Sequence, residues 1–313
     1  MSSLNLQDGR YLVTGANGFI GSALMTHLQD RDVPVLGTVR AGSADLGLVE
    51  ADPLGPEMQW SELLQGVDVI IHTAGLAHVL DASIDVVAQF ERVNVQGTAE
   101  LARQAAAAGV RRFVFLSSIG VNGAETVDGP FTEEREPRPE ADYARSKLKA
   151  EQVLRAVCAD TGMQCVIVRP PLVYAHHAPG NFARLRKLVR SGAPLPLSSI
   201  RNLRSLVALD NLVDFLVLCS HHPAAVGETF LVSDGVDFST PRLIELLAEG
   251  AGRKPRLWPA PVGVLRGLAR VIGRDATFRQ LACSLQMDIG KARTILGWQP
   301  PVPAEEALRR AGR

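Results

Sequence analysis

Tyr143 and Lys147 lie four residues apart in the segment Tyr-Ala-Arg-Ser-Lys, and this pair could transfer a proton. Residues four apart share one face of an α-helix, so the phenol and the ammonium group would be neighbours. A free phenol has a pKa of about 10, and a nearby positive charge lowers that pKa. Because any helix offers many such pairs, the spacing alone leaves two alternatives, a catalytic pair and two ordinary helix residues.

A glycine-rich loop near the N-terminus points to a second chemical task. Gly15, Gly18 and Gly21 are spaced three apart, after an apolar run at 10–15 and before a helical apolar pattern. Glycines in this context permit a tight turn, a close approach to a pyrophosphate and close helix packing. The N–H groups of the helix N-terminus then face the anion. The residues predicted to bind a dinucleotide here are Gly15, Asn17, Gly18, Phe19, Ile20 and Gly21.

The end of the next predicted strand, 33–40, bears on which dinucleotide binds. An acid at that position would bind the ribose hydroxyls of NAD, whereas an arginine accommodates the 2′-phosphate of NADP. No acid occurs from Gly37 to Ser43, and Arg40 is the first charged residue. Its guanidinium group can bind a phosphate in a bidentate manner. The sequence therefore favours NADP, with NAD and a merely exposed arginine as the alternatives.

Apolar strands that alternate with helices set the expected fold. The predicted strands are 10–15, 33–40, 68–75, 111–118 and 164–171. One predicted helix begins at 19, and two others cover 82–108 and 142–161. This order predicts an α/β fold, a doubly wound parallel sheet of the Rossmann type. After residue 171 the strands become short. We therefore expect a dinucleotide-binding domain at 1–171 and a smaller, mainly substrate-binding lobe at 172–313, with some segments returning to the sheet.

The composition of the chain argues against several classes of function. The 313 residues contain 33 Lys+Arg and 33 Asp+Glu, so nothing indicates a broad electrostatic grip on nucleic acid. No apolar run reaches the roughly 18 residues of a membrane span, and no secretory signal is visible. The four cysteines lack C-x-x-C spacing, which is typical of buried or incidental thiols, and the His pairs 176–177 and 221–222 suggest no metal site. A cytoplasmic protein is expected.

With the glycine loop, "LSSIGVNG" (116–123) and "YARSK" (143–147) in this order, the chain resembles the extended short-chain dehydrogenases/reductases. That class includes nucleotide-sugar epimerases, dehydratases and ketoreductases, and the resemblance covers almost the whole length. It implies that Tyr143 is the general acid/base and that Lys147 lowers the pKa of Tyr143 and holds the nicotinamide ribose. Ser118 would hydrogen-bond the same substrate oxygen, and Ser117 is the adjacent alternative. This order of motifs favours the catalytic pair.

The resemblance also implies roles for residues outside these motifs. Those expected at the cofactor are Asp52, Ala74, Gly75 and Pro170, with Asp52 near the adenine amine. Asn181 and Arg204 resemble groups that bind a nucleotide diphosphate, and Arg201 competes with Arg204 for that role. For Asn94, support of the active site and a purely structural role are both open.

Departures from the family pattern bear on the reaction. Sugar 4,6-dehydratases carry an Asp–Glu pair where this chain has Ile119 and Gly120, so dehydration is not expected. Arg40, Leu172 and Asn122 favour a 4-ketoreductase of a UDP-4-keto-6-deoxy-N-acetylhexosamine in surface-polysaccharide synthesis. The alternatives are a 4-epimerase of UDP-glucose or UDP-N-acetylglucosamine, a reductase of non-sugar ketones, and a non-catalytic cofactor-binding sensor.

Two expectations concern surfaces. Relatives often dimerise through two helices, here 82–108 and 142–161, so a homodimer is expected. The segment Pro261–Arg274 is amphipathic, with Arg266, Arg270 and Arg274 four residues apart. It indicates a packed helix with its basic face in solvent, and a membrane-surface helix is the alternative.

Overall fold

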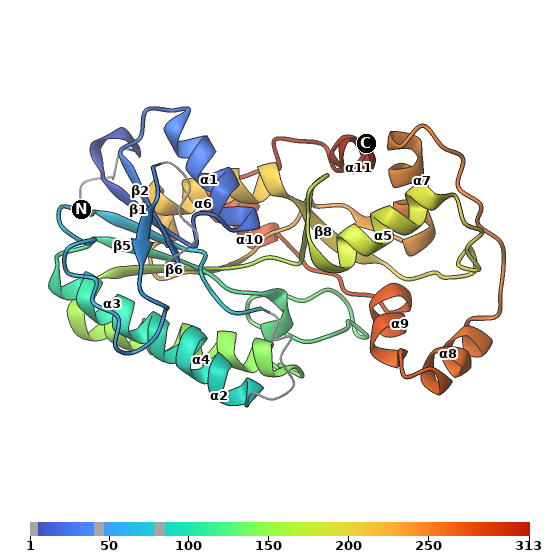
Figure 1. The fold of residues 1–313 in the computed structure, drawn as a ribbon, viewed down its shortest axis with the longest axis horizontal. Coiled ribbons are helices and arrows are strands. Elements are labelled where there is room, and N and C mark those ends of the chain that lie inside the picture. Colours follow the sequence, from blue (N-terminus) through green and yellow to red (C-terminus); the bar gives the residue numbers. More distant parts are fainter. Residues whose placement is uncertain (1–5, 41–46, 78–84) are drawn as a thin grey trace.

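The computed structural model describes residues 6–40, 47–77 and 85–313. Its main sheet has seven parallel strands in the order β3-β2-β1-β4-β5-β6-β9 (Figure 1). These strands are β1 (Tyr11–Thr14), β2 (Val35–Arg40), β3 (Val49–Ala51), β4 (Val69–His72), β5 (Arg112–Leu116), β6 (Gln164–Arg169) and β9 (Thr229–Leu231). The predicted doubly wound α/β fold is confirmed.

Helices cover both faces of this sheet. On β1, Tyr11 and Val13 point to one face and join the core formed with α1 (Phe19–Gln29) and α6 (Leu209–His221). Leu12 points to the other face, which packs under the helices α3 (Gly97–Ala107) and α4 (Asp142–Thr161). Burial on both faces explains why these strands are continuous apolar runs in the sequence.

The predicted helix at 82–108 consists of three parts. Residues 82–84 lie outside the described residues. The chain is then α-helical in α2 (Val86–Phe90), π-helical at Glu91–Gln96 and α-helical again in α3. A π-helical turn is rare and is often found at functional sites, and this one carries Asn94.

The chain after residue 171 builds a second lobe and also returns to the first. A small sheet of order β10-β8-β7 contains β7 (Leu172–Tyr174), β8 (Arg204–Ala208) and β10 (Asp237–Phe238). The lobe's helices are α5 (Gly180–Ser191), α7 (Thr240–Gly250), α8 (Val262–Val271), α9 (Asp275–Ala282) and α11 (Ala304–Gly312). By contrast, β9, α6 and α10 (Gly290–Leu296) belong to the main sheet and its core. No described helix is long and apolar enough to cross a bilayer.

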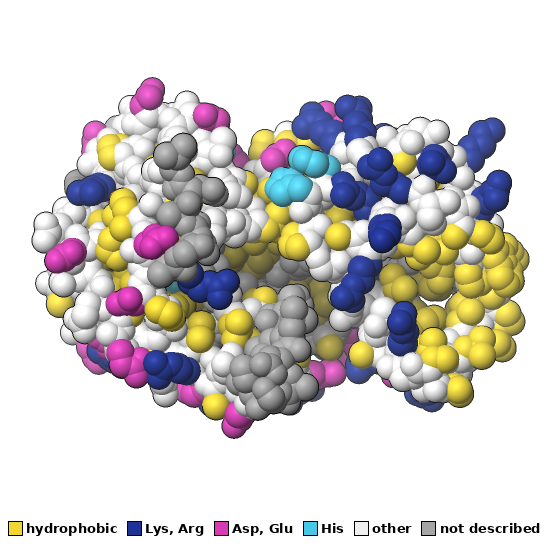
Figure 2. Space-filling model, viewed as in Figure 1, with side chains coloured by type: hydrophobic (Ala, Val, Ile, Leu, Met, Phe, Trp, Pro, Cys, Tyr) yellow, Lys and Arg dark blue, Asp and Glu magenta, His cyan; other side chains and the backbone are white. Residues whose placement is uncertain are grey.

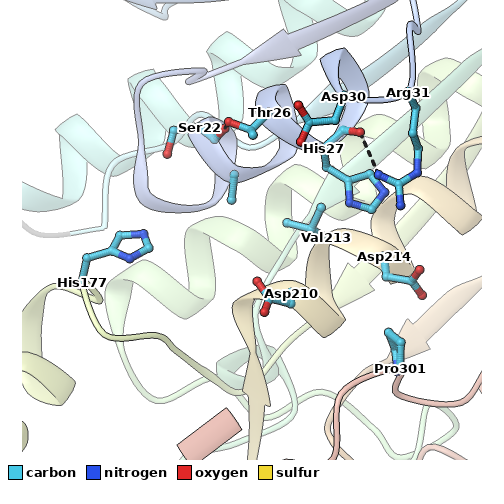
Figure 3. A pocket seen from close by; sticks show the side chains of 11 residues that line it. Ser22, Thr26, His27, Asp30, Arg31, His177, Asp210, Val213, Asp214 and Pro301 are labelled. Carbon is cyan, nitrogen blue, oxygen red and sulfur yellow. Dashed lines mark hydrogen bonds between the residues drawn. The ribbon is translucent and has the colours of Figure 1, made fainter. Parts of the chain in front are cut away.

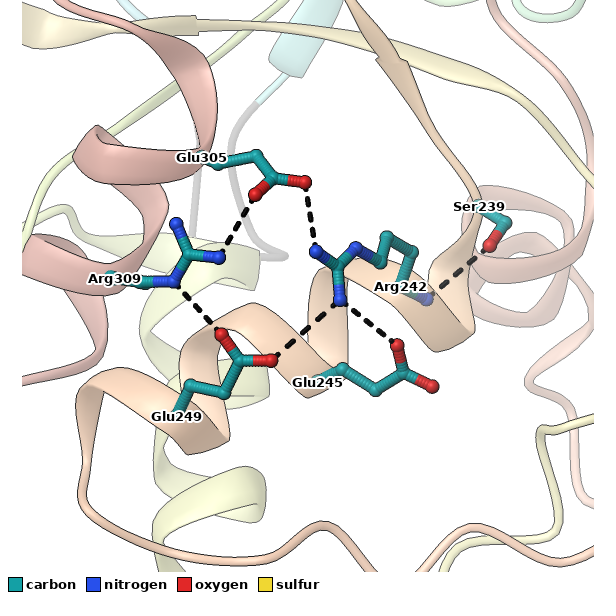
Figure 4. A network of polar contacts seen from close by, with 6 residues as sticks. All are labelled: Ser239, Arg242, Glu245, Glu249, Glu305 and Arg309. Atoms are coloured by element: carbon teal, nitrogen blue, oxygen red, sulfur yellow. Dashed lines mark hydrogen bonds and ion pairs between the residues drawn. The ribbon is translucent and has the colours of Figure 1, made fainter.

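Helices α7 and α11 approach each other closely. A Cβ atom on Gly250 would lie 1.9 Å from the carbonyl oxygen of Arg309, and one on Gly312 would lie 2.2 Å from that of Leu247. Beside this contact, two arginines bridge the two helices through three glutamates (Figure 4). The network consists of Arg242, Glu245, Glu249, Glu305 and Arg309.

Helix α8 corrects one expectation. Only Ala269 of this helix is buried, whereas Val264, Leu268 and Val271 are exposed. The prediction of a packed helix with only its basic face in solvent is therefore wrong for its apolar positions. Arg266 and Arg270 do lie in solvent.

Candidate active site

Tyr143 and Lys147 lie in the first turns of α4, which begins at Asp142 as predicted. The ammonium group of Lys147 donates a 2.9 Å hydrogen bond to the carbonyl oxygen of Leu116 and sits 4.6 Å from the centre of the Phe115 ring. Leu116 is the last residue of β5, two positions before Ser118. The contact therefore places the helix pair beside the strand end that carries the predicted catalytic serine.

Burial controls the pKa values of the pair. It lowers the pKa of Lys147 to about 8, against the opposing charge of Glu151. It raises the pKa of Tyr143 to about 12, so the phenol is not activated as the sequence led us to expect. The physical reason is that desolvation penalises the phenolate. In the protein without ligands Tyr143 is thus a neutral phenol at neutral pH, suited to donate a proton.

The two neighbouring serines have different surroundings. Ser117 is buried and donates a 2.5 Å hydrogen bond to Glu151, whose carboxylate also forms a buried ion pair with Arg169. Ser118 is half-buried, and its hydroxyl oxygen accepts a hydrogen bond from the N–H of Gly120 at 3.1 Å. The hydroxyl hydrogen of Ser118 is left for another partner. The geometry therefore supports Ser118, rather than Ser117, as the group that meets a substrate oxygen.

Asn94 connects the cofactor side to the helix of Tyr143. Its side chain accepts from the N–H of Leu76 at 2.8 Å and donates to the carbonyl of Leu76 at 2.9 Å. It also donates to the hydroxyl of Ser146, which in turn donates to the carbonyl of Tyr143. Asn94 is buried, so these contacts stand in place of water. A supporting role at the site fits this arrangement.

The glycine loop lies so close to neighbouring groups that side chains on its glycines would clash. Gly15 has φ +69°, and a Cβ atom there would lie 3.0 Å from the backbone of Ala74. A Cβ on Gly21 would lie 2.1 Å from the carbonyl oxygen of Gly15. A Cβ on Gly75 would come within 3.3 Å of the ammonium nitrogen of Lys147. The backbone here approaches neighbouring groups as a dinucleotide site requires.

A cavity of about 400 Å³ opens beside this loop. Seven of the predicted cofactor residues line it: Gly15, Asn17, Gly18, Arg40, Asp52, Ala74 and Gly75. Phe19, Ile20 and Gly21 form the first turn of α1, behind the loop. The carbonyl of Pro170 accepts a hydrogen bond from Ile119, next to Ser118. The residues present therefore fit a nicotinamide dinucleotide.

His72 contacts the strand end that leads into the glycine loop. Its role was not predicted from the sequence. It lies within hydrogen-bond distance of Thr14 (2.6 Å) and Thr98 (3.1 Å). Burial lowers the pKa of His72 to about 3, with Lys147 adding to the effect, so the ring is neutral at neutral pH. Thr73 then donates to the carbonyl of Thr14. These contacts join the carboxyl ends of β1 and β4 next to the glycine loop.

Sequence comparison bears on the identity of this site. The model of the NAD dependent epimerase/dehydratase family matches residues 11–233. The chain belongs to this family. It is an enzyme of the extended short-chain dehydrogenase/reductase type, as the motifs predict.

Individual relatives cover nearly the whole chain. A UDP-glucose 4-epimerase of Vibrio cholerae is 39% identical over 304 residues, which is 95% of this chain and 93% of that protein. An N-acetyl-α-D-glucosaminyl-diphospho-ditrans,octacis-undecaprenol 4-epimerase of Escherichia coli O157:H7 is 25% identical, over 96% of this chain and 93% of that protein. A UDP-glucuronic acid 4-epimerase of Bacillus cereus, solved with NAD, superposes with a TM-score of 0.78 at 22% identity, covering 97% of this chain and 95% of that one.

The two predicted substrate-binding residues, Asn181 and Arg204, both contact one segment of the second lobe. Asn181 donates a 2.7 Å hydrogen bond to Gln280, and Arg204 donates to the carbonyl of Cys283 at 3.0 Å. Arg201, the competitor of Arg204, is exposed. Arg279 of the same segment pairs with Glu125 and Glu140 of the first lobe. The segment 279–283 thus links the two lobes, which the sequence did not indicate.

A second, open depression of about 550 Å³ lies between α1 and α6 (Figure 3). Its charged and imidazole side chains are His27, Asp30, Arg31, His177, Asp210 and Asp214. It shares no lining residue with the cofactor cavity. In the described part of the chain, no group of three or more His, Cys, Asp or Glu side chains could hold a metal ion. We assign this depression no part in the chemistry.

Proposed function

We propose that this enzyme is an NAD(P)-dependent oxidoreductase that acts at C4 of a UDP-hexose, and that it interconverts the two C4 epimers. The observation that carries the proposal is that Lys147, one turn beyond Tyr143, lies next to Gly75 of the cavity lining and is hydrogen-bonded to the strand end that leads to Ser118. The 39% identity to a UDP-glucose 4-epimerase over 95% of the chain supports C4 of a nucleotide sugar as the point of attack.

Each side chain has a task in this proposal. A bound nicotinamide dinucleotide would supply the chemistry of hydride transfer at C4. With the positive charges of Lys147 and an oxidised nicotinamide beside it, Tyr143 would ionise despite its burial, take the proton of the C4 hydroxyl as phenolate and give it back, while Ser118 would hold the same oxygen. Lys147, fixed on the Leu116 carbonyl, supplies the positive charge that favours phenolate and donates to the nicotinamide ribose. Positioned acid–base groups of this kind contribute about 10²–10⁴-fold.

The remaining predicted residues extend the site. Arg40 and Asp52 line the far part of the cavity, where the adenosine half of the cofactor would lie. An arginine at this position supports NADP, while the name of the family and the NAD complex of the Bacillus cereus relative favour NAD. Asn181 and Arg204 would bind the sugar-nucleotide diphosphate, since both face the segment 279–283.

A 4-ketoreductase of a UDP-4-keto-6-deoxy-N-acetylhexosamine in surface-polysaccharide synthesis is the second candidate. Arg40 favours it, because a reductase exchanges its cofactor and often uses NADPH. The relative from Escherichia coli O157:H7 acts by name on an undecaprenyl-linked sugar, which supports a place in polysaccharide synthesis. We further propose that the enzyme is a homodimer through α2–α3 and α4, and light scattering that gives a monomer mass would refute this point.

Turnover separates the candidates. We expect UDP-glucose or UDP-N-acetylglucosamine to reach an equilibrium mixture of C4 epimers, with catalytic NAD or NADP and no net change in absorbance of the reduced cofactor. Stoichiometric oxidation of NADPH by a UDP-4-keto sugar, without epimerisation, would identify the ketoreductase. Cofactor binding without turnover of any of these compounds would indicate a sensor.

A further inference from the structure

The outer end of the C-terminal lobe carries an exposed apolar stripe. On α8, Val264 and Leu268 are each 58% exposed and Val271 is 85% exposed. Positions i, i+4 and i+7 lie on one face of a helix, so the three side chains form one stripe. Ile272, directly after the helix, is 66% exposed and extends it. Soluble proteins rarely leave such a face uncovered.

An exposed aromatic side chain precedes α8 in the chain. Trp258, in the segment that leads into α8, is 49% exposed, and its backbone is fixed on Leu195 by a 3.0 Å hydrogen bond. Tryptophan has an apolar body and a polar N–H, which suits a boundary between water and hydrocarbon. Figure 2 shows hydrophobic side chains gathered at this end of the lobe, next to α8.

The surroundings of the stripe are basic. The sequence has no acidic residue from 250 to 274, and its cations there are Arg253, Lys254, Arg256, Arg266, Arg270 and Arg274. The first acid after this run, Asp275, lies 3.8 Å from Arg266 and 3.3 Å from Arg270, so one carboxylate serves two guanidinium groups. On the face shown in Figure 2, Lys and Arg side chains outnumber acidic ones over this lobe. No acid occurs from 161 to 209 either.

We propose that α8 and Trp258 form a docking surface for a bilayer that contains anionic phospholipid. A helix with one apolar face and arginines on its polar face lies in the plane of a membrane surface, with the apolar face among the acyl chains. Basic residues near an anionic leaflet each contribute about fivefold in affinity, about 1 kcal/mol. The charge decides between occupants, because two copies of this chain would bring like charges together, whereas anionic headgroups complement them.

The test is co-sedimentation of the full-length protein with vesicles. We expect binding to vesicles of phosphatidylcholine with phosphatidylglycerol, weaker binding to phosphatidylcholine alone, and weakening by salt. Val264→Asp removes an apolar contact and adds a negative charge, so it reduces the affinity about tenfold or more. Lys254→Gln with Arg256→Gln reduces it about thirtyfold. Both variants keep sugar-nucleotide turnover in solution.

The chain offers a matched control in Val127, a loop valine outside the proposed dimer helices that is 81% exposed. Val127→Asp leaves vesicle binding unchanged. Binding that survives Val264→Asp, or absence of binding by the wild type under all lipid compositions, overturns the proposal. Sedimentation velocity that shows wild-type self-association abolished by Val264→Asp would instead assign the stripe to a second copy of the chain. Circular dichroism spectra confirm that each variant is folded.

Discussion

The ammonium nitrogen of Lys147 lies 2.9 Å from the carbonyl oxygen of Leu116, so the helix that carries Tyr143 is fastened to the strand that leads to Ser118. Three residues from two separate segments are thereby brought to one strand end. Burial at the same place gives Lys147 a pKa of about 8 and Tyr143 a pKa of about 12. The proposed chemistry depends on which of these two groups is protonated.

Replacement of Tyr143 by Phe removes the proposed acid–base group. We expect kcat to fall about 10²–10⁴-fold, while the affinity for the dinucleotide, measured by calorimetry, stays within a few-fold. Tyr11→Phe is the matched control, because it removes a buried hydroxyl that lies 3.3 Å from the hydroxyl of Ser220, away from the proposed site. It lowers the free energy of unfolding by about 1 kcal/mol and leaves kcat unchanged. Equal losses of kcat in both variants would remove Tyr143 from the mechanism.

Lys147 makes stability depend on pH in the alkaline range. Unfolded chains keep the lysine proton to about pH 10.5, the ordinary pKa, whereas the folded protein releases it at about pH 8. Between these values the unfolded state binds more protons, so the free energy of unfolding rises with pH from this group. Urea unfolding of the cofactor-free wild type and of Lys147→Met measures the effect as a difference. Parallel pH curves for the two proteins would show that Lys147 is not buried as described.

Arg40 governs the choice of dinucleotide if it binds the 2′-phosphate. Arg40→Asp should weaken NADP binding about tenfold to hundredfold, the cost of losing a charged hydrogen bond, and strengthen NAD binding. Arg103→Asp, at an exposed arginine of α3, should change neither affinity. Titration of both nucleotides by fluorescence measures the preference. A preference that Arg40→Asp does not alter would make Arg40 an ordinary surface residue.

The buried ion pair of Glu151 with Arg169 supports the site from behind. Glu151→Gln leaves Arg169 without its counter-charge in the interior, and we expect a loss of about 3–5 kcal/mol in the free energy of unfolding. Glu57 makes a similar pair with Arg92 on the surface. Because exposed pairs contribute little, Glu57→Gln should leave the free energy of unfolding nearly unchanged. Chemical denaturation of both variants gives the comparison, and similar losses would contradict the proposed burial.

The crossing of α7 and α11 depends on two glycines. Gly250→Ala places a methyl group 1.9 Å from the carbonyl oxygen of Arg309, and we expect the two helices to separate at a cost of about 1–3 kcal/mol. Gly267→Ala in α8 meets nothing within 4 Å and should raise stability by up to about 1 kcal/mol. Thermal unfolding distinguishes these opposite signs. A Gly250→Ala protein as stable as the wild type would refute the close crossing.

The sequence predicted the features that depend on local patterns. Continuous apolar runs revealed the parallel strands, and the α4 helix begins and ends at the predicted residues, Asp142 and Thr161. Gly15, Gly18 and Arg40, which the sequence predicts at one ligand, line one cavity in the structure. These features follow from periodicity and from residues whose backbone role is specific. The roles of Ser118, Tyr143 and Lys147 in turnover stay predictions.

What the sequence did not reveal depends on contacts between distant segments. The hydrogen bonds of His72 with Thr14 and Thr98 join residues 58 and 26 apart. Helical periodicity could have suggested Glu151, since it lies one turn beyond Lys147, but its partner Arg169 is on another element. The raised pKa of Tyr143 comes from burial, which spacing does not report. The exposed apolar stripe of α8 was not predicted, because an amphipathic pattern predicts a helix but does not show which surface the apolar side chains pack against.

The most direct test of the proposed reaction uses UDP-glucose labelled with deuterium at C4. If Tyr143 moves the hydroxyl proton while a bound dinucleotide takes and returns the hydride, the UDP-galactose formed keeps its deuterium at C4. No cofactor is consumed in that case, and mass spectrometry with NMR shows the label. Loss of the deuterium to reduced cofactor in solution, or the absence of any C4 epimer, would contradict the proposal that this enzyme is a UDP-hexose 4-epimerase.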